Sequence, residues 1–333
     1  MRLPTLLTAI LIVTRCLAAP PTETPTETPS AETEPNDHWA IEDARQRAAL
    51  PLYKIIPAAT PQELTPANGY PKRDAYTTWH RSHGDATNSR YSLLDQINRD
   101  NVAQLQVAWT YYSDDDAWKT NLECNPIIAD GVMYAPTVGD YLAAVNAATG
   151  EEIWISSVGN LPAWRGLLYW PGDDDHAARL LFSTDSALCA IDTETGHPVT
   201  SFGQEGRVAG AGGYVAPCIF KNIVVTASGG VVGGYDVISG ESLWKKDIGG
   251  GGNCWAGIAM DQQRGIAYVQ FGAPHPNFDG SRRHGSNQHS NSVVALQAPN
   301  GQILWSFQEI RHGIWDLDIP APPNLVTITR SGR

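Results

Sequence analysis

The sequence repeats one pattern four times: AAVNAATGEEIW at 143–154, CAIDTETGHPVT at 189–200, GGYDVISGESLW at 233–244 and VALQAPNGQILW at 294–305. The eighth residue of each copy is a glycine, namely Gly150, Gly196, Gly240 and Gly301. Four residues before the glycine stands a polar side chain, Asn146, Asp192, Asp236 or Gln297. An Asn or Asp side chain closes a tight turn, and glycine tolerates the left-handed conformation that ends it. Each copy therefore predicts a strand, a turn and a second strand.

The spacing of the copies predicts the architecture. Successive turn glycines are 46, 44 and 61 residues apart, and periods in the mid-forties with about four short strands are typical of β-propeller blades. Four residues after each glycine stands Trp154, Thr200, Trp244 or Trp305. An aromatic ring at this fixed offset can pack against a neighbouring unit, and Phe202 is the candidate for that place in the second copy. A β-sandwich with chance similarity is the alternative, and four copies argue against it.

Between the turns lie β-rich apolar runs bounded by Asp, Asn or Gly, which predict further strands. These runs are NPIIADGVMYAPT (125–137), RLLFSTD (179–185), IFKNIVVTAS (219–228) and GIAYVQFG (265–272). The last period is longer because it contains the polar loop GAPHPNFDGSRRHGSNQHSNS (272–292). Long insertions in repeat proteins collect on one face, often the binding face.

The first 75 residues predict export and a lead-in to the repeats. Arg2, an apolar run and the small residues Ala18 and Ala19 are typical of a secretory signal over 1–19, and the run is too short to span a bilayer. A lipoprotein signal through Cys16 is the weaker alternative. Residues 20–37 have the Pro, Thr and Glu composition of a disordered linker, and 38–75 predict a short helix followed by irregular chain. We expect an exported, periplasmic protein without a transmembrane segment.

Charge and cysteine content restrict the partners. The net charge of −12 argues against nucleic acid, whose backbone would repel such a surface. No C-x-x-C-H motif is present, so no covalent haem site is expected. If the signal is removed, Cys124, Cys189, Cys218 and Cys254 remain. We expect these thiols to be buried or bridged rather than reactive, and the sequence leaves any pairing open.

The Asp-x-x-x-Gly-x-x-x-Trp repeats resemble the tryptophan-docking motifs of the pyrroloquinoline quinone (PQQ)-dependent alcohol, methanol and glucose dehydrogenases. Three further segments also resemble this family: TTWHRSHGDATNSRYSLLDQINRDNVAQLQVAWTY (77–111), RGLLYWPGD (165–173) and WSFQEIRHGIWDLDIPAPPNL (305–325). The resemblance implies an all-β, eight-bladed propeller with the cofactor near its axis, incomplete here because residues 76–333 supply about four blades. We therefore expect a fragment of a longer enzyme, with a naturally truncated product as the alternative.

The resemblance also implies which residues bind the cofactor. PQQ is a flat quinone with three carboxylates, so its site needs a cation, an aromatic face and a Lewis acid. Arg165 matches the family arginine that binds PQQ, and Glu123 matches an acid that hydrogen-bonds it. Trp255 matches the tryptophan whose ring lies against PQQ, and Asn253 stands where relatives have a hydroxyl. Asp316 matches the catalytic aspartate, which takes the substrate's hydroxyl proton and lies beside the metal.

Two departures concern the metal that relatives hold. Where many relatives have a metal-binding carboxylate, this sequence reads SGGVVGGYD, without an acid before Asp236. Where relatives have an Asn ligand before a Pro, it has Ala273. Calcium prefers several oxygen ligands, and of the expected side chains only Asp316 remains. The alternatives are a different ligand set, for which Asn277 and Asp279 are candidates, a cofactor held without strong metal binding, or a lost activity.

Two functions follow from these observations. The first is a periplasmic PQQ-dependent dehydrogenase that oxidises an alcohol or an aldose sugar and passes electrons to a cytochrome or a membrane quinone. The second is a non-catalytic propeller that keeps the repeats as a protein-binding scaffold. A scaffold has no need of Arg165, Trp255 and Asp316 together, so their co-occurrence favours the enzyme.

Overall fold

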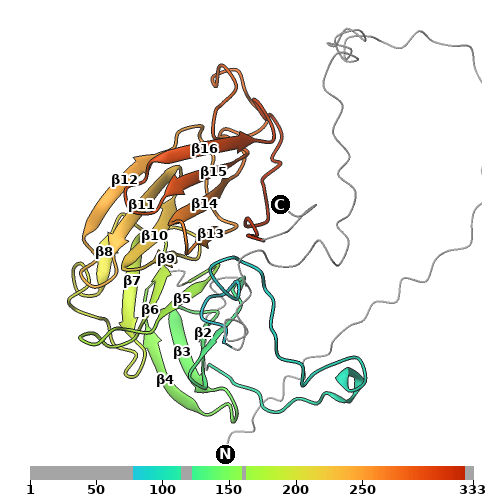
Figure 1. Cartoon of the computed structure of the whole chain (residues 1–333), viewed down its shortest axis with the longest axis vertical. Coiled ribbons are helices and arrows are strands. Elements are labelled where there is room, and N and C mark those ends of the chain that lie inside the picture. The colour runs from blue at the N-terminus through green and yellow to red at the C-terminus, as the bar shows by residue number, and fades with distance from the viewer. Residues whose placement is uncertain (1–77, 114–121, 160–162, 327–333) are drawn as a thin grey trace, which may run out of the picture. The chain divides into compact units, whose positions relative to one another are not determined.

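The computed structural model describes residues 78–113, 122–159 and 163–326, all of which belong to one compact unit, Ala59–Arg333. The expected signal, linker and lead-in lie outside these residues. The described chain forms four four-stranded antiparallel sheets and one 3-10 turn, η3 (Val102–Gln104) (Figure 1). No helix among these residues is long and apolar enough to cross a membrane.

Each sheet is a simple meander in which consecutive strands pair. The first contains β1 (Ile127–Ala129), β2 (Val132–Pro136), β3 (Tyr141–Asn146) and β4 (Glu152–Ser157). The second contains β5 (Leu167–Trp170), β6 (Arg179–Ser183), β7 (Ala187–Asp192) and β8 (Arg207–Ala209). The third contains β9 (Cys218–Phe220), β10 (Ile223–Ser228), β11 (Val231–Asp236) and β12 (Ser242–Asp247). The fourth contains β13 (Ile258–Asp261), β14 (Ile266–Phe271), β15 (Ser292–Gln297) and β16 (Ile303–Gln308).

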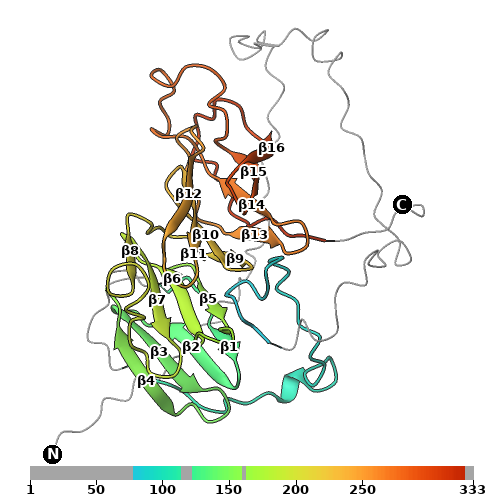
Figure 2. The ribbon, with the colours of Figure 1, turned by 60° about the vertical axis from the view of Figure 1, so that its left-hand side comes forward.

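Consecutive sheets pack against each other through three apolar clusters. The first cluster joins the first and second sheets, and includes Leu142 and Leu180. A second joins the second and third sheets, for example through Leu188 and Val224, and a third joins the third and fourth sheets. The first strands of neighbouring sheets also contact each other, β1 with β5 and β9 with β13 (Figure 2). This is the blade arrangement that the repeat predicts, and it confirms the all-β propeller.

The repeat turns have the predicted chemistry. In the first turn Asn146 Oδ1 accepts hydrogen bonds from the backbone N–H groups of Ala148 and Thr149, at 2.9 and 3.1 Å. Asp192 and Asp236 make the same pairs of bonds in the next two turns. The four turn glycines have φ between 69° and 76°. The fourth turn has Gln297, whose Oε1 accepts from the Asn300 amide instead.

Each docking aromatic ring lies on the turn glycine of the following repeat. A Cβ at Gly196 would lie 2.7 Å from the Trp154 ring, and the Trp154 indole donates to the Thr193 carbonyl at 3.0 Å. Trp244 docks in the same way on Gly301, and Trp109 docks on Gly150. The repeat did not reveal Trp109, because it precedes the first turn.

In the second repeat, two residues take the place of the docking tryptophan. Pro198 follows the turn and has no N–H to donate, and β8 begins only at Arg207. Phe202 is fully buried against Gly240, as the sequence suggested. A phenyl ring has no donor, and Arg179 supplies one because its Nη1 donates to the Val237 carbonyl at 3.0 Å. Val237 stands three residues before its glycine, as Thr193 does.

A central segment (residues 79–88) links all four sheets. Trp79 pairs with Ile128 of β1, and the Ser82 N–H donates to the Leu167 carbonyl of β5 at 3.1 Å. The Arg81 guanidinium is buried and donates to the Pro217 and Ala216 carbonyls, just before β9, and to Asn88 Oδ1. Finally, the Met260 N–H of β13 donates to the Ala86 carbonyl at 2.7 Å.

The described cysteines belong to the buried core. The four described cysteines are buried and unpaired, and burial raises the thiol pKa of Cys218 and Cys254 to about 12. The expectation of buried thiols is therefore confirmed.

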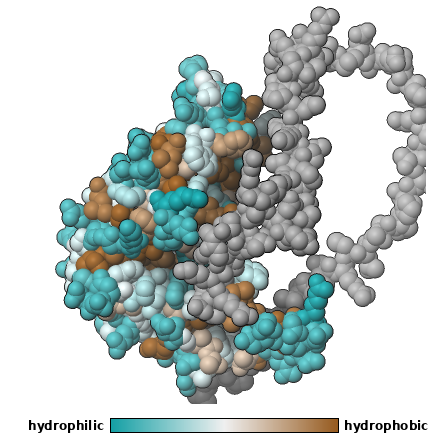
Figure 3. All heavy atoms as spheres, viewed as in Figure 1, coloured by the Kyte–Doolittle hydropathy of each residue, from teal (hydrophilic) through white to brown (hydrophobic). Residues whose placement is uncertain are grey.

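Two of the repeat tryptophans differ in exposure. Trp154 is 9% exposed, whereas Trp305 of β16 is 47% exposed and contacts Tyr268. The face seen in Figure 3 is largely hydrophilic, with separate hydrophobic patches.

The docking of Trp154 on Gly196 predicts a position-specific cost of an added methyl group. Gly196→Ala would force a left-handed alanine into contact with the indole, whereas Gly131 has a similar φ of 80° and open space around it. We expect Gly196→Ala to lower the free energy of unfolding by about 1–3 kcal/mol more than Gly131→Ala. Urea denaturation of both variants measures the difference, and equal losses would contradict ring docking.

Burial of His83 predicts a pH dependence of stability. Burial, aided by Arg81 and Arg90, lowers the pKa of His83 to about 3 from 6.5. In the unfolded chain His83 therefore binds a proton below pH 6.5, whereas in the folded chain it binds this proton only near pH 3. The stabilisation is complete above pH 6.5 and is lost as pH falls toward 3.

We therefore expect the urea midpoint to fall between pH 7 and pH 5, and to fall less in His83→Gln. Denaturation curves at both values of pH test this. An identical decrease in the variant would show that His83 is not responsible.

Candidate functional site

Arg165 and Glu123 form an ion pair at the centre of the candidate site. Arg165 precedes β5 in a short turn that the Gly166 N–H closes on the Ala163 carbonyl at 2.9 Å. Gly166 is required there, since a Cβ would lie 2.5 Å from Ala216. Arg165 Nη2 lies 2.7 Å from Glu123 Oε2, with the two side chains 27% and 32% exposed. The structure thus brings together two residues that the family resemblance selected separately.

Two tryptophan rings lie beside the Arg165 guanidinium. Its Cζ atom is 4.4 Å from the centre of the Trp255 ring and 5.8 Å from that of Trp164. Trp164 also packs edge-on against Tyr214, with ring centres 4.9 Å apart. The Trp164 indole N–H is buried without a hydrogen-bond partner. Sequence reasoning did not select Trp164, although it adjoins Arg165.

Asp318 holds Trp255. The Trp255 indole donates to Asp318 Oδ2 at 2.6 Å, and the Ala273 N–H donates to Asp318 Oδ1 at 2.5 Å. The carboxylate lies so close to Gly272 that a Cβ there would be 2.2 Å from Oδ1. The sequence suggested only a structural role for Asp318, and no motif signals its contact with Trp255.

Asn253 and Asp316 lie on the loops that carry these residues. Asn253 is half-buried, and its carbonyl accepts the Gly272 N–H at 2.8 Å, which fixes the loop two residues before Trp255. Asp316 is exposed and accepts a hydrogen bond from the Asn277 amide at 2.6 Å on Oδ1. Glu123, Arg165 and Trp255 therefore form one cluster, and Asp316 belongs to the segment whose Asp318 completes it.

This cluster suits a flat ligand that carries negative charge. A guanidinium binds carboxylates in a planar, two-pronged geometry, and an indole face binds a flat ring. Both groups are half-buried here, and the aromatic neighbours reduce their contact with water. The donors, the faces and the unpartnered Trp164 N–H therefore fit a carboxylated quinone.

The residues do not fit the calcium site that the family resemblance implies. No group of three or more His, Cys, Asp or Glu side chains that could hold a metal ion occurs within residues 78–113, 122–159 and 163–326. The Asp236 carboxylate closes its repeat turn, and a Cβ at Gly234 would lie 2.3 Å from the Trp244 indole. Ala273 has no side-chain oxygen to offer a metal, and its N–H donates to Asp318. Of the side chains considered as metal ligands, Asp316 and Asn277 lie in contact with each other.

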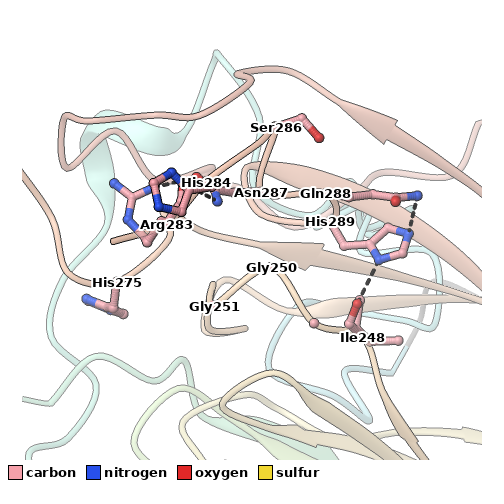
Figure 4. A pocket seen from close by; sticks show the side chains of 11 residues that line it. Ile248, Gly250, Gly251, His275, Arg283, His284, Ser286, Asn287, Gln288 and His289 are labelled. Atoms are coloured by element: carbon pink, nitrogen blue, oxygen red, sulfur yellow. Dashed lines mark hydrogen bonds between the residues drawn. The ribbon is translucent and has the colours of Figure 1, made fainter. Parts of the chain in front are cut away.

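A cavity of about 610 Å³ lies next to this region (Figure 4). Gly250 and Gly251 line one side, and the other side is lined by residues of the inserted loop, namely His275, Arg283, His284, Ser286, Asn287, Gln288 and His289. The predicted cofactor residues do not line it. Its histidines, His284 and His289 included, do not form a metal cluster within the described chain.

Comparison with known proteins confirms the family resemblance. Residues 79–333 match the family model described as "Glucose/ethanol/alcohol dehydrogenase, beta-propeller domain". Quinoprotein glucose dehydrogenase A of Acinetobacter calcoaceticus is 31% identical over 72% of this chain and 38% of its own length. The dehydrogenase subunit of the quinone-dependent alcohol dehydrogenase of Gluconacetobacter polyoxogenes is 30% identical, over 78% and 41%.

A solved structure shows the same fold. The quinohemoprotein alcohol dehydrogenase from Comamonas testosteroni superposes with a TM-score of 0.62 at 26% identity, over 77% of this chain and 44% of that one. The chain spans 38% to 41% of the length of the two curated relatives above. With a family model that covers most of the chain, the conclusion is that this protein belongs to the glucose/ethanol/alcohol dehydrogenase β-propeller family of quinoproteins.

Proposed function

We propose that this chain is part of an exported, periplasmic PQQ-dependent dehydrogenase that oxidises an alcohol or an aldose sugar. The observation that carries the proposal is the Arg165 guanidinium, which pairs with Glu123 and lies over the Trp255 ring. The names of its relatives, a quinoprotein glucose dehydrogenase and a quinone-dependent alcohol dehydrogenase, support this substrate range. Because the chain matches less than half of either relative, the whole enzyme's activity belongs to the proposal.

Each residue of the cluster has a role in this proposal. Arg165 binds a carboxylate or quinone oxygen of PQQ, and Glu123 orients the guanidinium. Trp255 offers its ring face, and Asp318 fixes that ring. Asn253 offers an amide near the same ring. When bound, PQQ supplies the two-electron acceptor for the substrate.

Asp316 is the proposed base. Its carboxylate is exposed, and the hydrogen bond from Asn277 is made to Oδ1, so the group is open to a substrate hydroxyl. A carboxylate within hydrogen-bond reach of that hydroxyl can take its proton. Electrons then leave to a cytochrome or a membrane quinone. We assign no step to a metal ion.

The missing calcium ligands favour a second candidate, a non-catalytic propeller that binds other proteins. Such a scaffold needs the docking aromatic residues but not the Arg165–Trp255 cluster. Binding of PQQ therefore distinguishes the two functions.

Titration of the full chain with PQQ tests the proposed function. We expect saturable binding by calorimetry, and we expect Arg165→Ala to weaken it roughly 10- to 100-fold, because a charge-assisted pair is lost. Arg264→Ala is the matched control, since Arg264 is exposed and pairs with Asp261 on a distant turn. Absence of binding would favour the scaffold, and equal affinities in both variants would show that Arg165 does not bind PQQ.

The contact between Asp318 and Trp255 predicts a second effect on binding. In Asp318→Asn one of the two accepting oxygens becomes an NH2 group, which cannot accept, so either the Trp255 indole or the Ala273 N–H loses its partner. We expect the free energy of unfolding to fall by about 1–3 kcal/mol and PQQ affinity to fall with it. The exposed Asp279→Asn, which keeps an oxygen for the Ser281 N–H, serves as the control. Unchanged affinity would show that Trp255 needs no support from Asp318.

A further inference from the structure

The segment that carries Asp316 is poorly buried. In the segment 309–318, here called the Asp316 segment, Gly313 is the buried residue. Ile314, Trp315 and Leu317 are exposed despite their apolar side chains. Since burial of apolar surface contributes little here, polar contacts must fix the position of this segment.

Apart from the hydrogen bond from the Trp255 indole to Asp318, the contacts described here come from residues 273–291 of the inserted loop, here called the clamp loop. The Glu309 N–H donates to the Asn291 carbonyl at 2.8 Å, and the His312 N–H donates to the Ser286 carbonyl at 2.9 Å. In return, the Asn291 side-chain amide donates to the Leu317 carbonyl at 2.6 Å. His312 Nδ1 also lies 2.7 Å from the Gly285 carbonyl.

Arg283 joins the two ends of the clamp loop to the Asp316 segment. Its Nε donates to the Pro276 carbonyl at 3.2 Å, and its Nη1 donates to Asn287 Oδ1. Its Nη2 donates to the Gly313 carbonyl at 2.9 Å. Arg283 lines the cavity of Figure 4, yet all three of its nitrogens donate to the protein itself. It therefore acts as a cross-link within the fold.

Asn277 reaches Asp316 directly. Its amide donates to Asp316 Oδ1 at 2.6 Å, and the adjacent Phe278 ring packs edge-on against Trp315 with centres 6.4 Å apart. Two neighbouring residues of the clamp loop thus contact two neighbouring residues of the Asp316 segment. An amide donor on one carboxylate oxygen orients the other oxygen and leaves it open.

We propose that the clamp loop positions the proposed base, with Asn277 holding the Asp316 carboxylate and Arg283 holding the backbone that carries it. This inference rests on the proposed function for the role of Asp316 as a base. The physical clamp is independent of that role. The insertion that lengthens the fourth repeat then has a positioning role for the proposed base.

Hydrogen exchange tests the clamp without any turnover. The amides of Glu309 and His312 donate to the clamp loop, so peptides that cover 309–318 report its integrity. We expect Arg283→Ala to speed exchange in these peptides by roughly 10-fold or more, without change in the β-strands. Arg282→Ala, next to it and exposed, is the control. Unchanged exchange in Arg283→Ala would overturn the proposal.

Kinetics of the PQQ-loaded full chain test positioning of the base. Asn277→Asp keeps the shape of the side chain but replaces its N–H donor with a carboxylate oxygen beside Asp316, and Asn300→Asp provides the same change on a distant turn. We expect Asn277→Asp to lower kcat roughly 10- to 100-fold, with KM and PQQ affinity nearly unchanged. Asn277→Gln, which keeps a donor, should recover part of the loss.

The two experiments separate the two ideas. A wild-type chain that shows the clamp in hydrogen exchange but no PQQ-dependent turnover would contradict the proposed function and overturn the positioning role with it. Turnover that is insensitive to Asn277→Asp would overturn the positioning role alone. Loss of kcat together with faster exchange in Arg283→Ala would support both.

Discussion

The fold depends on an indole ring that lies flat on a left-handed glycine. At Gly150, Gly196 and Gly301 a Cβ would lie within 2.7 Å of the docking tryptophan, so neither the glycine nor its conformation can change independently. The indole N–H then donates to the carbonyl three residues before the glycine. One contact therefore fixes the turn of one repeat and attaches it to the preceding repeat. The second repeat keeps the same two contacts without a tryptophan, because Phe202 supplies the ring and Arg179 supplies the hydrogen-bond donor. The contacts, and not the tryptophan itself, are therefore what the repeat requires.

The central segment has the complementary function. Docking acts between turns at the periphery of successive sheets, whereas residues 79–88 contact the first strands β1, β5 and β13 and the chain before β9. Arg81 is buried, and its nitrogens donate to two backbone carbonyls and to Asn88. Burial of a charge is costly unless its donors are satisfied, so these carbonyls must remain in place. The candidate site begins at Arg165, two residues before the β5 strand that this segment holds.

The sequence predicted what is periodic or local and missed what depends on distant contacts. Turn chemistry and docking offsets recur every repeat, so the sheets, the buried rings and the place of Phe202 could be predicted. The family resemblance selected Glu123, Arg165 and Trp255, and the structure brings them together. The contacts of Trp255 with Asp318 and of Asp316 with Asn277 join residues 63 and 39 positions apart. No local pattern marks such pairs. The role of Arg179 also depends on a distant contact, its hydrogen bond to the Val237 carbonyl, and could not be predicted from the sequence.

The pair Asp316 and Asp318 shows how two identical side chains, one residue apart, acquire different roles. Asp318 accepts from the Trp255 indole and from a backbone N–H, so both of its oxygens are occupied by fixed donors. A carboxylate engaged in this way holds the Trp255 ring and the backbone at Ala273 in place. Asp316 accepts from Asn277 on one oxygen and lies exposed. The geometry therefore gives Asp318 a structural role and leaves Asp316 as the exposed carboxylate of the pair, held by the clamp loop through Asn277.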